Sequence, residues 1–518
     1  MTMGAAASRL RAKTGTSASR VNAEDIIIGN DLLELVSSAM YVDPMSIFRE
    51  YVQNAADGIE QARRTGALDQ VAPGTVHIEI DSKPRSVRIR DNGVGLGGDT
   101  FVKRLTALGA SAKRGTDARG FRGVGRLAGL AYAQDLLFRS RSDKSESVRE
   151  LCWDGRMLKA LMRETDGPND IRALIERIVT VKDIAGEDYP EHFFEVELRG
   201  IVRLRGDPLL NPNAIADYLA QVAPLPFSPA FSHGAAITAR LAQNVVQAPL
   251  ALTVSGIDGP VYRPHRDMIA NGNKTPLAVH AVSFIDVPDI DGTVGAVGWF
   301  LHHDYEGALA TATLQKGFRL RVGDIQVGGD ALLEQEFPES RFNSWTVGEL
   351  HVLDRRIVPN ARRDHFEQNA HFANLVNHLG PHFRDIAHRC RTSSVQRKAQ
   401  RDLELALEAT SGSLDLLRQN SVTPAARTRL VREIEGQIDK AEQLAAASEA
   451  TAPIVDKVAH ARSALSELAD LGSVDPLAFL KPKERGQYQR FFELIYECSQ
   501  NRVAAKALVD RIIAKISE

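Results

Sequence analysis

The chain has 518 residues, with 64 basic and 66 acidic side chains and a formal net charge of -2. A chain of this length is too long for one hydrophobic core, so we expect several domains. The hydrophobic fraction of 43% and the charged fraction of 25% are typical of folded globular proteins and indicate neither a disordered chain nor a membrane protein. The near-neutral charge excludes a global field that attracts nucleic acid or an anionic membrane, and only a local basic surface stays open.

Cysteine spacing and the first residues bear on the cellular compartment. Cys152, Cys390 and Cys498 lie far apart and form no CxxC pair, which argues against a zinc site or a disulfide framework. Residues 1–24 are rich in Ala, Ser, Thr and Arg, so we expect a disordered tail there, with an organellar transit peptide as the alternative. No run approaches the roughly 18 apolar residues of a membrane span, so we expect a cytoplasmic location and no membrane partner.

Three regions follow this tail, and together they predict a multidomain protein of the α/β (α+β) class. Residues 25–226 alternate helical and strand-like segments, and residues 227–390 form a second mixed α/β region. The strand-like stretches of this second region are 251–255, 278–284, 293–300 and 318–322. Residues 391–518 are dominated by helix-forming residues and predict a helical region divided at Thr423-Pro424, Ala452-Pro453 and Lys481-Pro482.

The first motif that carries chemistry lies in a predicted helix over residues 43–64, with Asp43 as its N-cap. Glu50, Asn54 and Asp57 project from one face of this helix because their spacing is i, i+4 and i+7. Two carboxylates and an amide oxygen suit a hard cation such as Mg²⁺ together with a base for water. A solvated helix face with this spacing by chance is the alternative.

The second motif, VRIRDNGVGL, begins within the second strand of a predicted hairpin of strands 76–80 and 86–90. The second strand ends at Asp91, and Gly93 and Gly95 follow. A carboxylate beside glycines that let a ligand approach the backbone suits recognition of an adenine amino group. A plain Asn-Gly hairpin turn is the alternative, and the second glycine argues against it.

The third motif is the glycine-rich and basic segment LTALGASAKRGTDARGFRGVGRLAGLAYA, which leads into an apolar helix from about residue 124. Its glycines can turn backbone N–H groups toward phosphate oxygens, and the dipole of the following helix adds to this attraction. A flexible surface loop is the alternative. The segment is not a Walker A loop, because the pattern GxxxxGK[ST] does not occur in the chain.

In this order the three motifs resemble the N, G1 and G2 boxes of the GHKL ATPase superfamily. FREYVQNAADGIEQAR most closely resembles the ninety-kilodalton heat-shock chaperones, and GFRG also resembles MutL. The resemblance implies a Bergerat-type fold for residues 25–226, which is a helix-and-sheet sandwich that holds ATP, with Mg²⁺, under a mobile lid.

The resemblance also implies roles for individual residues. Glu50 would be the general base that activates water, Asn54 would coordinate Mg²⁺, and Asp57 would support the same helix face. Asp91 would bind the adenine. Two glycines would shape the base pocket and eight further residues would contact or cover the phosphates: Gly93 and Gly95 for the base, and Ser111, Lys113, Gly120, Phe121, Arg122, Gly123, Val124 and Gly125 for the phosphates.

Two departures from the family pattern concern the same pocket. The chaperones carry a Gly-Thr pair before the last strand of this domain, where this chain reads PEHFFEVELRG, so one pocket contact is in doubt. Arg126 stands where an aromatic residue follows the last glycine of the lid. Its guanidinium could add a phosphate partner or point to solvent.

The middle region, residues 227–390, resembles the middle domain of the chaperones in GFRLRVGDIQV and ELHVLDRRIVPNARRDHFEQN. Asn360, Arg363 and Asp364 match the Asn-x-x-Arg-acid pattern of the loop in that domain. The resemblance implies that Arg363 reaches the terminal phosphate and stabilises charge in the transition state, with Arg362 as the competing candidate. A basic loop that is solvated or binds nucleic acid is the alternative.

These observations predict a chaperone-like, Mg²⁺-dependent ATP hydrolase that turns over slowly and drives conformational change on a protein client or regulatory partner. The alternatives are a DNA-acting GHKL ATPase of the MutL or MORC kind, in DNA repair or genome defence, and a scaffold that binds nucleotide without hydrolysis. Apolar residues in the helical region predict a homodimer, unless they are ordinary bundle core; they are Leu403, Leu405, Leu407, Leu414, Leu416 and Leu417.

Overall fold

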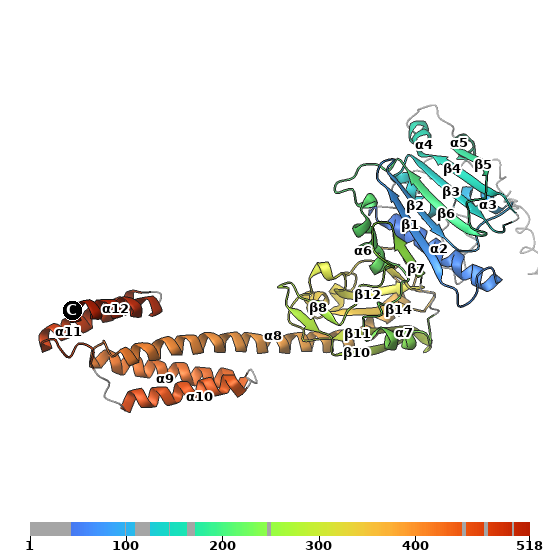
Figure 1. Cartoon of the computed structure of the whole chain (residues 1–518). Coiled ribbons are helices and arrows are strands. Elements are labelled where there is room, and N and C mark those ends of the chain that lie inside the picture. The colour runs from blue at the N-terminus through green and yellow to red at the C-terminus, as the bar shows by residue number, and fades with distance from the viewer. Residues whose placement is uncertain are drawn as a thin grey trace, which may run out of the picture. The chain divides into compact units, whose positions relative to one another are not determined.

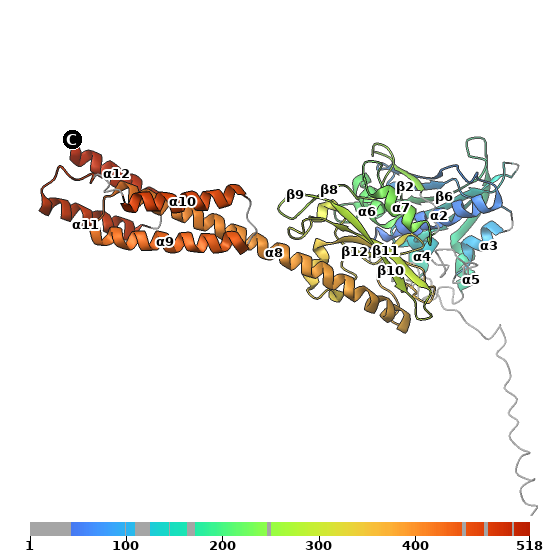
Figure 2. The ribbon, with the colours of Figure 1, turned by 90° about the horizontal axis from the view of Figure 1, so that it is seen from below.

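The computed structural model describes residues 43–98, 100–108, 125–144, 146–162, 171–245, 250–447, 452–470, 475–499 and 502–518. The chain divides into two compact units. The first contains residues up to 303 with 309–336 and 346–380, and the second contains 304–308, 337–345 and 381–518. The first unit is mixed α/β and the second is largely helical (Figures 1 and 2), which confirms the predicted fold class. The four predicted domain ranges stay predictions.

A seven-stranded sheet lies at the centre of the first unit, in the order β5-β4-β3-β6-β2-β1-β7. Neighbouring strands are antiparallel, except that β1 and β7 are parallel. Residues 251–255, which the sequence groups with the middle region, thus fall almost entirely in a strand of the first sheet. The strands are β1 (Gly74–Asp81), β2 (Ser86–Asp91), β3 (Asp135–Arg141), β4 (Val148–Asp154), β5 (Val179–Ile184), β6 (Phe193–Arg199) and β7 (Leu250–Val254).

The predicted hairpin of β1 and β2 is confirmed. Asp81 pairs with Ser86 across a turn in which Arg85 adopts a φ of 53°. Along β1, Val76 and Ile78 are buried and their neighbours Thr75, His77 and Glu79 are exposed, because successive side chains of a strand point to opposite faces. One face of the sheet is therefore apolar and ready to pack against a helix.

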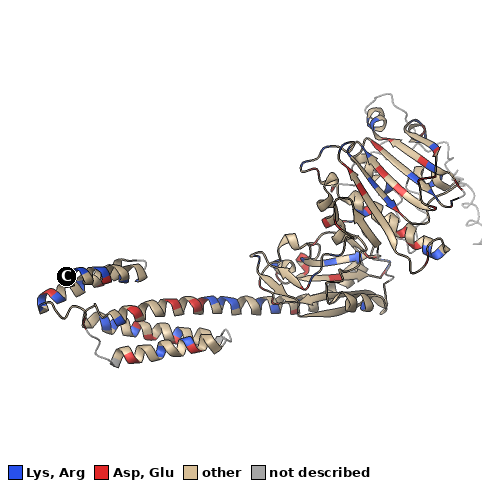
Figure 3. Ribbon diagram, in the orientation of Figure 1, with Lys and Arg blue, Asp and Glu red and all other residues tan. Residues whose placement is uncertain are grey.

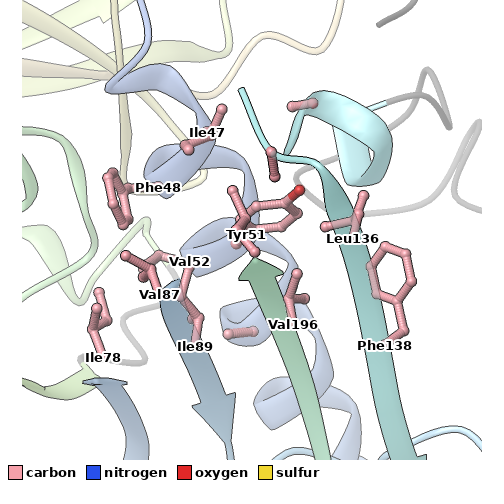
Figure 4. Close-up of a cluster of buried hydrophobic side chains, with 14 of the residues drawn as sticks. Ile47, Phe48, Tyr51, Val52, Ile78, Val87, Ile89, Leu136, Phe138 and Val196 are labelled. Atoms are coloured by element: carbon pink, nitrogen blue, oxygen red, sulfur yellow. The ribbon is translucent and has the colours of Figure 1, made fainter. Parts of the chain in front are cut away.

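Helix α2 (Ser46–Thr65) packs against that apolar face (Figure 4). Burying a large apolar side chain stabilises the fold by roughly 1.5–3 kcal/mol, so this packing fixes the rotation of α2 about its axis. The helix thereby keeps a neighbouring face for polar side chains. The buried cluster includes Ile47, Phe48, Tyr51 and Val52 of the helix with Ile78, Val87, Ile89, Leu136, Phe138 and Val196 of the strands.

The start of α2 differs from the prediction, which placed its N-cap at Asp43. The helix begins at Ser46, and the backbone N–H of Met45 donates to Asp43 Oδ1 at 3.0 Å in a turn that precedes it. The Ser46 N–H donates to the Asp43 carbonyl at 3.1 Å. Asp43 therefore caps this separate turn and not the continuous helix.

Charged residues of both signs lie along neighbouring strands of the sheet (Figure 3). They alternate with the apolar residues that face α2, so their side chains lie on the opposite face. Arg139 Nη1 lies 2.7 Å from a carboxylate oxygen of Glu195 and of Glu197, and its Nε lies 2.6 Å from Glu150. Arg90 lies 2.6 Å from Glu195. Because the signs alternate, this face as a whole has no strong attraction for a polyanion or a polycation.

A second, five-stranded sheet in the order β10-β11-β14-β12-β13 lies in the same unit, with a two-stranded sheet of β8 and β9. The strands predicted at 278–284, 293–300 and 318–322 are confirmed as parts of β9 to β12. The bounds are β8 (Met268–Ala270), β9 (Pro276–Ala278), β10 (Ala281–Pro288), β11 (Val294–His302), β12 (Gly317–Val322), β13 (Ile325–Val327) and β14 (Val347–Val352).

Short helices complete the first unit and the segment 337–345 of the second. The α-helices are α3 (Thr100–Thr106), α4 (Gly155–Leu161), α5 (Ile171–Ile178), α6 (Pro212–Val222) and α7 (Gly234–Leu241). The 3-10 helices are η3 (Gly125–Ala131), η4 (Pro208–Leu210), η5 (Thr311–Thr313), η6 (Glu334–Glu336) and η7 (Ser340–Trp345).

A buried ionic cluster joins the end of α6 to the second sheet. Glu349 of β14 accepts from Arg263 at 2.6 Å and from Arg321 of β12 at 2.7 Å. Arg321 Nη2 also donates to the carbonyl of Gln221 at 2.6 Å, and Arg263 Nε donates to that of Leu225 at 2.7 Å. Arginines beside Glu349 hold the pKa of its carboxyl below the ordinary value although burial opposes this. The cluster stays ionised and fixes the second sheet against the chain that leaves α6.

The second unit is built from long helices: α8 (Ala370–Gln419) from Pro381 onward, α9 (Pro424–Ala447), α10 (Ala452–Asp470), α11 (Pro482–Cys498) and α12 (Arg502–Ser517). Helices α9, α10 and α11 start at the predicted Pro-containing breaks. Helices α8, α9 and α10 share one hydrophobic core, and α11 and α12 share a smaller one. Among the described helices, none combines the length and apolar composition needed to cross a bilayer.

The leucines that predicted a homodimer divide between core and surface. Leu403, Leu414 and Leu417 belong to the core of α8, α9 and α10, and Leu416 is also buried. Leu405 is 59% exposed. Ordinary bundle core therefore explains most of this pattern.

We predict that Leu403→Ala destabilises the helical unit by about 2–5 kcal/mol, because it leaves a cavity in the α8–α10 core. The matched control Leu405→Ala should change the stability by less than about 0.5 kcal/mol, since that side chain is largely exposed. Urea unfolding of the full chain, followed by hydrogen exchange of α9 and α10, measures both. Equal losses in the two variants would contradict the assignment of Leu403 to the core.

Candidate functional site

Helix α2 carries three of the predicted site residues. Glu50, Asn54 and Asp57 are half-buried and follow one another along the side of the helix that the sheet does not cover. All three offer oxygen atoms. These three residues therefore share one face of the helix, as predicted. The apolar residues of α2 that pack into the sheet set the direction in which this face points.

The turn after β2 brings Asp91, Gly93 and Gly95 against α2 and the neighbouring strands. Asp91 is buried, and its Oδ1 accepts a hydrogen bond of 2.8 Å from the Gly93 N–H. The Val94 N–H donates to the Gly58 carbonyl of α2 at 3.1 Å. From Asn92 to Gly98 the chain runs as a loop, so the alternative of a plain hairpin turn is wrong.

Close backbone contacts explain the glycines of this turn. A Cβ on Gly93 would lie 2.7 Å from the Gly58 backbone, and a Cβ on Gly95 would lie 2.0 Å from the Arg141 carbonyl oxygen. Gly95 also has a φ of 66°, which residues with a side chain rarely adopt. Ser140 holds the same loop, since its hydroxyl accepts from the Leu96 N–H at 2.7 Å.

Burial raises the pKa of Asp91 to about 8, and the Gly93 hydrogen bond only partly opposes this effect. A carboxyl in this environment is stabilised by any bound group that donates hydrogen to it. The amino group of adenine is such a donor. The chemistry of the position therefore fits the predicted role of Asp91.

Most of the predicted phosphate loop lies outside the described residues: Ser111, Lys113, Gly120, Phe121, Arg122, Gly123 and Val124. Gly125 is the first residue of η3, and a Cβ on it would lie 2.2 Å from Glu50 Oε2. The Tyr51 hydroxyl joins η3 to α2, because it accepts from the Gly129 N–H at 2.9 Å and donates to the Arg126 carbonyl at 3.1 Å. The described end of this segment thus lies directly beside Glu50.

Arg126, which departs from the family pattern, points into the protein. Its Nη2 donates to the carbonyl of Ala107, and burial lowers its pKa to about 10. Of the two expectations for this side chain, the exposed orientation is wrong.

The loop around Arg363 is a tight hairpin organised by Asn360. The Asn360 N–H donates to the His365 carbonyl at 2.9 Å, the Arg363 N–H donates to the Asn360 carbonyl at 3.2 Å, and Asn360 Nδ2 donates to Asp364 Oδ1 at 2.6 Å. Arg363 adopts a φ of 56°, and its carbonyl accepts from the Gly328 N–H at 2.9 Å. Asn360 and Asp364, two residues of the matched pattern, therefore stabilise the loop that carries its third residue, Arg363.

This loop meets α2 at Glu50. Arg363 Nε lies 3.4 Å from Glu50 Oε1, and its Nη1 donates to Gln53 Oε1. Arg49 donates to the carbonyls of Arg362 at 3.1 Å and Arg363 at 3.5 Å. The side chain of Arg362 is exposed. The arrangement places a guanidinium beside the carboxylate, and Arg363 fits that position better than its competitor.

Sequence reasoning did not single out Arg49 and Gln53. Both are buried although they are polar, and Gln53 is three residues from Glu50 and thus on the same side of the helix. A polar residue that interrupts a buried stripe was the available signal.

Comparison with known proteins agrees with this geometry. Residues 45–162 match the family model described as histidine kinase-, DNA gyrase B- and HSP90-like ATPase. This segment is therefore an ATPase domain of the GHKL type.

Relatives found among curated proteins are named chaperone protein HtpG. The protein of Nitrobacter winogradskyi is 34% identical over 112 residues, which are 20% of this chain and 16% of the relative. Those of Clostridium acetobutylicum and Helicobacter acinonychis are each 24% identical, over 202 residues (35% and 31%) and 144 residues (24% and 23%). The chain thus spans only about a sixth to a third of these relatives. The predicted resemblance to the ninety-kilodalton heat-shock chaperones is confirmed over this partial length.

We predict that the stability of the nucleotide-free protein falls between pH 4 and pH 8 because of Asp91. The folded state, with a pKa of about 8, holds a proton that the unfolded state, with a pKa of about 3.9, releases, so raising the pH through this window favours unfolding. Relative to Asp91→Asn, the free energy of unfolding of the parent should fall by on the order of 1 kcal/mol per pH unit where this dependence on pH is steepest.

Urea denaturation at pH 5, 6, 7 and 8 of both proteins measures this difference, and the titration of other groups cancels in the comparison. A difference that stays constant from pH 5 to pH 8 would refute the raised pKa.

Proposed function

We propose that this chain binds ATP with Mg²⁺ and hydrolyses it slowly, and that the cycle drives a conformational change on a protein client. The observation that carries the proposal is the meeting of Glu50 on α2 with Arg363 on a distant loop, with 3.4 Å between carboxylate and guanidinium. A base on the GHKL-type ATPase segment and a cation brought beside it by a loop of the middle region are two groups that suit in-line water attack on a γ-phosphate.

The residues fit both bound groups. Asp91, buried and with a raised pKa, suits a hydrogen-donating base, and the close backbone around Gly93 and Gly95 suits a flat ring. Within the described ranges, no group of three or more His, Cys, Asp or Glu side chains could hold a metal. Mg²⁺ would therefore be held by the nucleotide phosphates together with the oxygen of Asn54, where it would neutralise phosphate charge.

In this mechanism each side chain has one task. Glu50 takes the proton of the attacking water, and Asp57 supports the same face of α2. Arg363 exchanges its ion pair with Glu50 for a contact with the phosphate and stabilises the charge that develops there. This exchange requires the loop to stay docked on α2, so turnover is slow if docking limits the rate.

A chaperone-like role is supported by the names of the relatives, and a client or regulatory protein is the partner we propose.

The DNA-acting alternative is not favoured, because these relatives are chaperone proteins and the charged sheet face carries both signs. The cytoplasmic location stays a prediction from the sequence, in which no apolar run has the length of a membrane span.

A homodimer is the assembly we propose, through the end of the helical unit. The pair α11 and α12 buries only a small core and leaves large apolar side chains exposed: Phe491 (50%), Leu494 (53%), Val503 (70%) and Leu508 (43%), with Phe479 (52%) in the turn before α11. A second copy would cover such side chains, as stable interfaces hide about 800 Å² on each partner.

The pocket is tested by Mg²⁺-dependent ATP turnover and equilibrium ATP binding. We expect Glu50→Ala to bind ATP but to lose turnover by about 10²-fold or more, because the base is removed. Asp91→Asn should lose binding, and the control Glu60→Ala, a glutamate of α2 paired with Arg64 at the surface, should match the parent. If the parent binds without hydrolysing, the scaffold alternative holds; if it does not bind ATP, the proposal fails.

The assembly is tested by sedimentation over a range of protein concentrations. We expect the parent mass to approach twice 56.7 kDa, and the double substitution Phe491→Ser with Leu494→Ser to raise the dissociation constant at least tenfold. Val395→Ser, on an exposed position of α8, is the control. A parent that remains a monomer at every concentration would reject the dimer.

A further inference from the structure

We infer that Gln53 is a positioning residue for Arg363, whose side chain it holds in place beside Glu50. The inference rests on the proposed ATPase function and concerns the same site. It begins with the burial of Gln53, which is only 1% exposed although it lies on the side of α2 that carries Glu50. A buried amide without a hydrogen-bond partner costs free energy, so a glutamine at this place needs a specific partner.

The partner is the guanidinium of Arg363, which lies far away in the sequence. Gln53 Oε1 accepts from Arg363 Nη1 while Arg363 Nε faces Glu50 Oε1. The two acceptors stand three residues apart on one side of α2, and together they fix the plane of a rigid guanidinium. A single acceptor would leave the guanidinium free to rotate about its long side chain.

The backbone of the same loop is held by other groups. Arg49 donates to the carbonyls of Arg362 and Arg363, and the Gly328 N–H donates to that of Arg363. These bonds keep the loop and its left-handed residue in place without Gln53. The amide of Gln53 therefore acts on the side chain of Arg363 and not on the path of the loop.

The neutrality of this amide suits a cation that must serve a phosphate. A carboxylate at position 53 would neutralise the guanidinium, whereas an amide oxygen holds it and leaves its charge available. When Arg363 exchanges Glu50 for phosphate, the bond to Gln53 can persist. Gln53 then acts as the fixed point about which the arginine turns.

The test is a double-mutant cycle on the full-length protein. Gln53→Met keeps the size of the side chain but removes the acceptor, so folding is preserved. We expect it to lower kcat on the order of tenfold with KM and the ATP dissociation constant unchanged within about twofold, because only the position of Arg363 is lost. In an Arg363→Ala background the same substitution should cause no further loss of kcat.

The matched control is Gln61→Met, an exposed glutamine of the same helix, which should behave as the parent. Unchanged kcat in Gln53→Met, or losses from Gln53→Met and Arg363→Ala that multiply in the double variant, would overturn the inference.

A second cycle, without nucleotide, separates failure of this inference from failure of the proposed function. The free energy of unfolding is measured for the parent, Gln53→Met, Arg363→Ala and the double variant. We expect the double variant to lose less free energy of unfolding than the sum of the two single losses, because both substitutions remove the same hydrogen bond. If the parent does not hydrolyse ATP but shows this coupling, only the ATPase proposal is contradicted. If the losses of stability are additive, the assigned contact between Gln53 and Arg363 is contradicted.

Discussion

The packing of helix α2 on the seven-stranded sheet is the constraint on which the rest of the site depends. Ile47, Phe48 and Val52 are fully buried, so the helix can neither rotate nor slide without exposing them. Because its apolar stripe is fixed, the side that carries Glu50, Gln53 and Asn54 is fixed as well. The positions of these polar side chains are therefore set by the hydrophobic packing of the other face of α2 on the sheet.

Two further segments are held against α2 by polar contacts. The loop after β2 is joined to it by the Val94–Gly58 hydrogen bond and by glycines that allow close approach. The loop of Arg363 is joined to it by Arg49 and Gln53. A buried carboxyl from the loop after β2 and a guanidinium from a distant loop are thereby held against the helix that carries the carboxylate of Glu50. Such convergence of ionisable groups is what we expect of a binding site.

Local patterns of the sequence predicted much of this arrangement. The hairpin of β1 and β2, the shared face of Glu50 and Asn54, and the breaks before α9 and α11 all depend on neighbours in the chain, where periodicity and proline act directly. The ATPase family was predicted from three motifs and is confirmed by comparison.

Features that depend on distant parts of the chain were missed. The parallel pairing of β7 with β1 joins segments separated by about 170 residues, and nothing in the pattern of residues 250–254 distinguishes it from a strand of the second sheet. The hydrogen bond between Gln53 and Arg363 likewise joins a helix and a loop that are about 310 residues apart in the sequence. The later start of α2 has a local cause, because a turn at Asp43 mimics a helix cap.

The roles assigned to Ser111 and Lys113 stay predictions, since these residues lie outside the described part of the chain.

The most direct test of the central claim is an experimental structure of the protein with Mg²⁺ and a non-hydrolysable ATP analogue. The account predicts that the adenine amino group lies within hydrogen-bond distance of Asp91. It also predicts that the terminal phosphate lies between Glu50 and Arg363. An analogue bound elsewhere, or an adenine that does not contact Asp91, would contradict the proposed site.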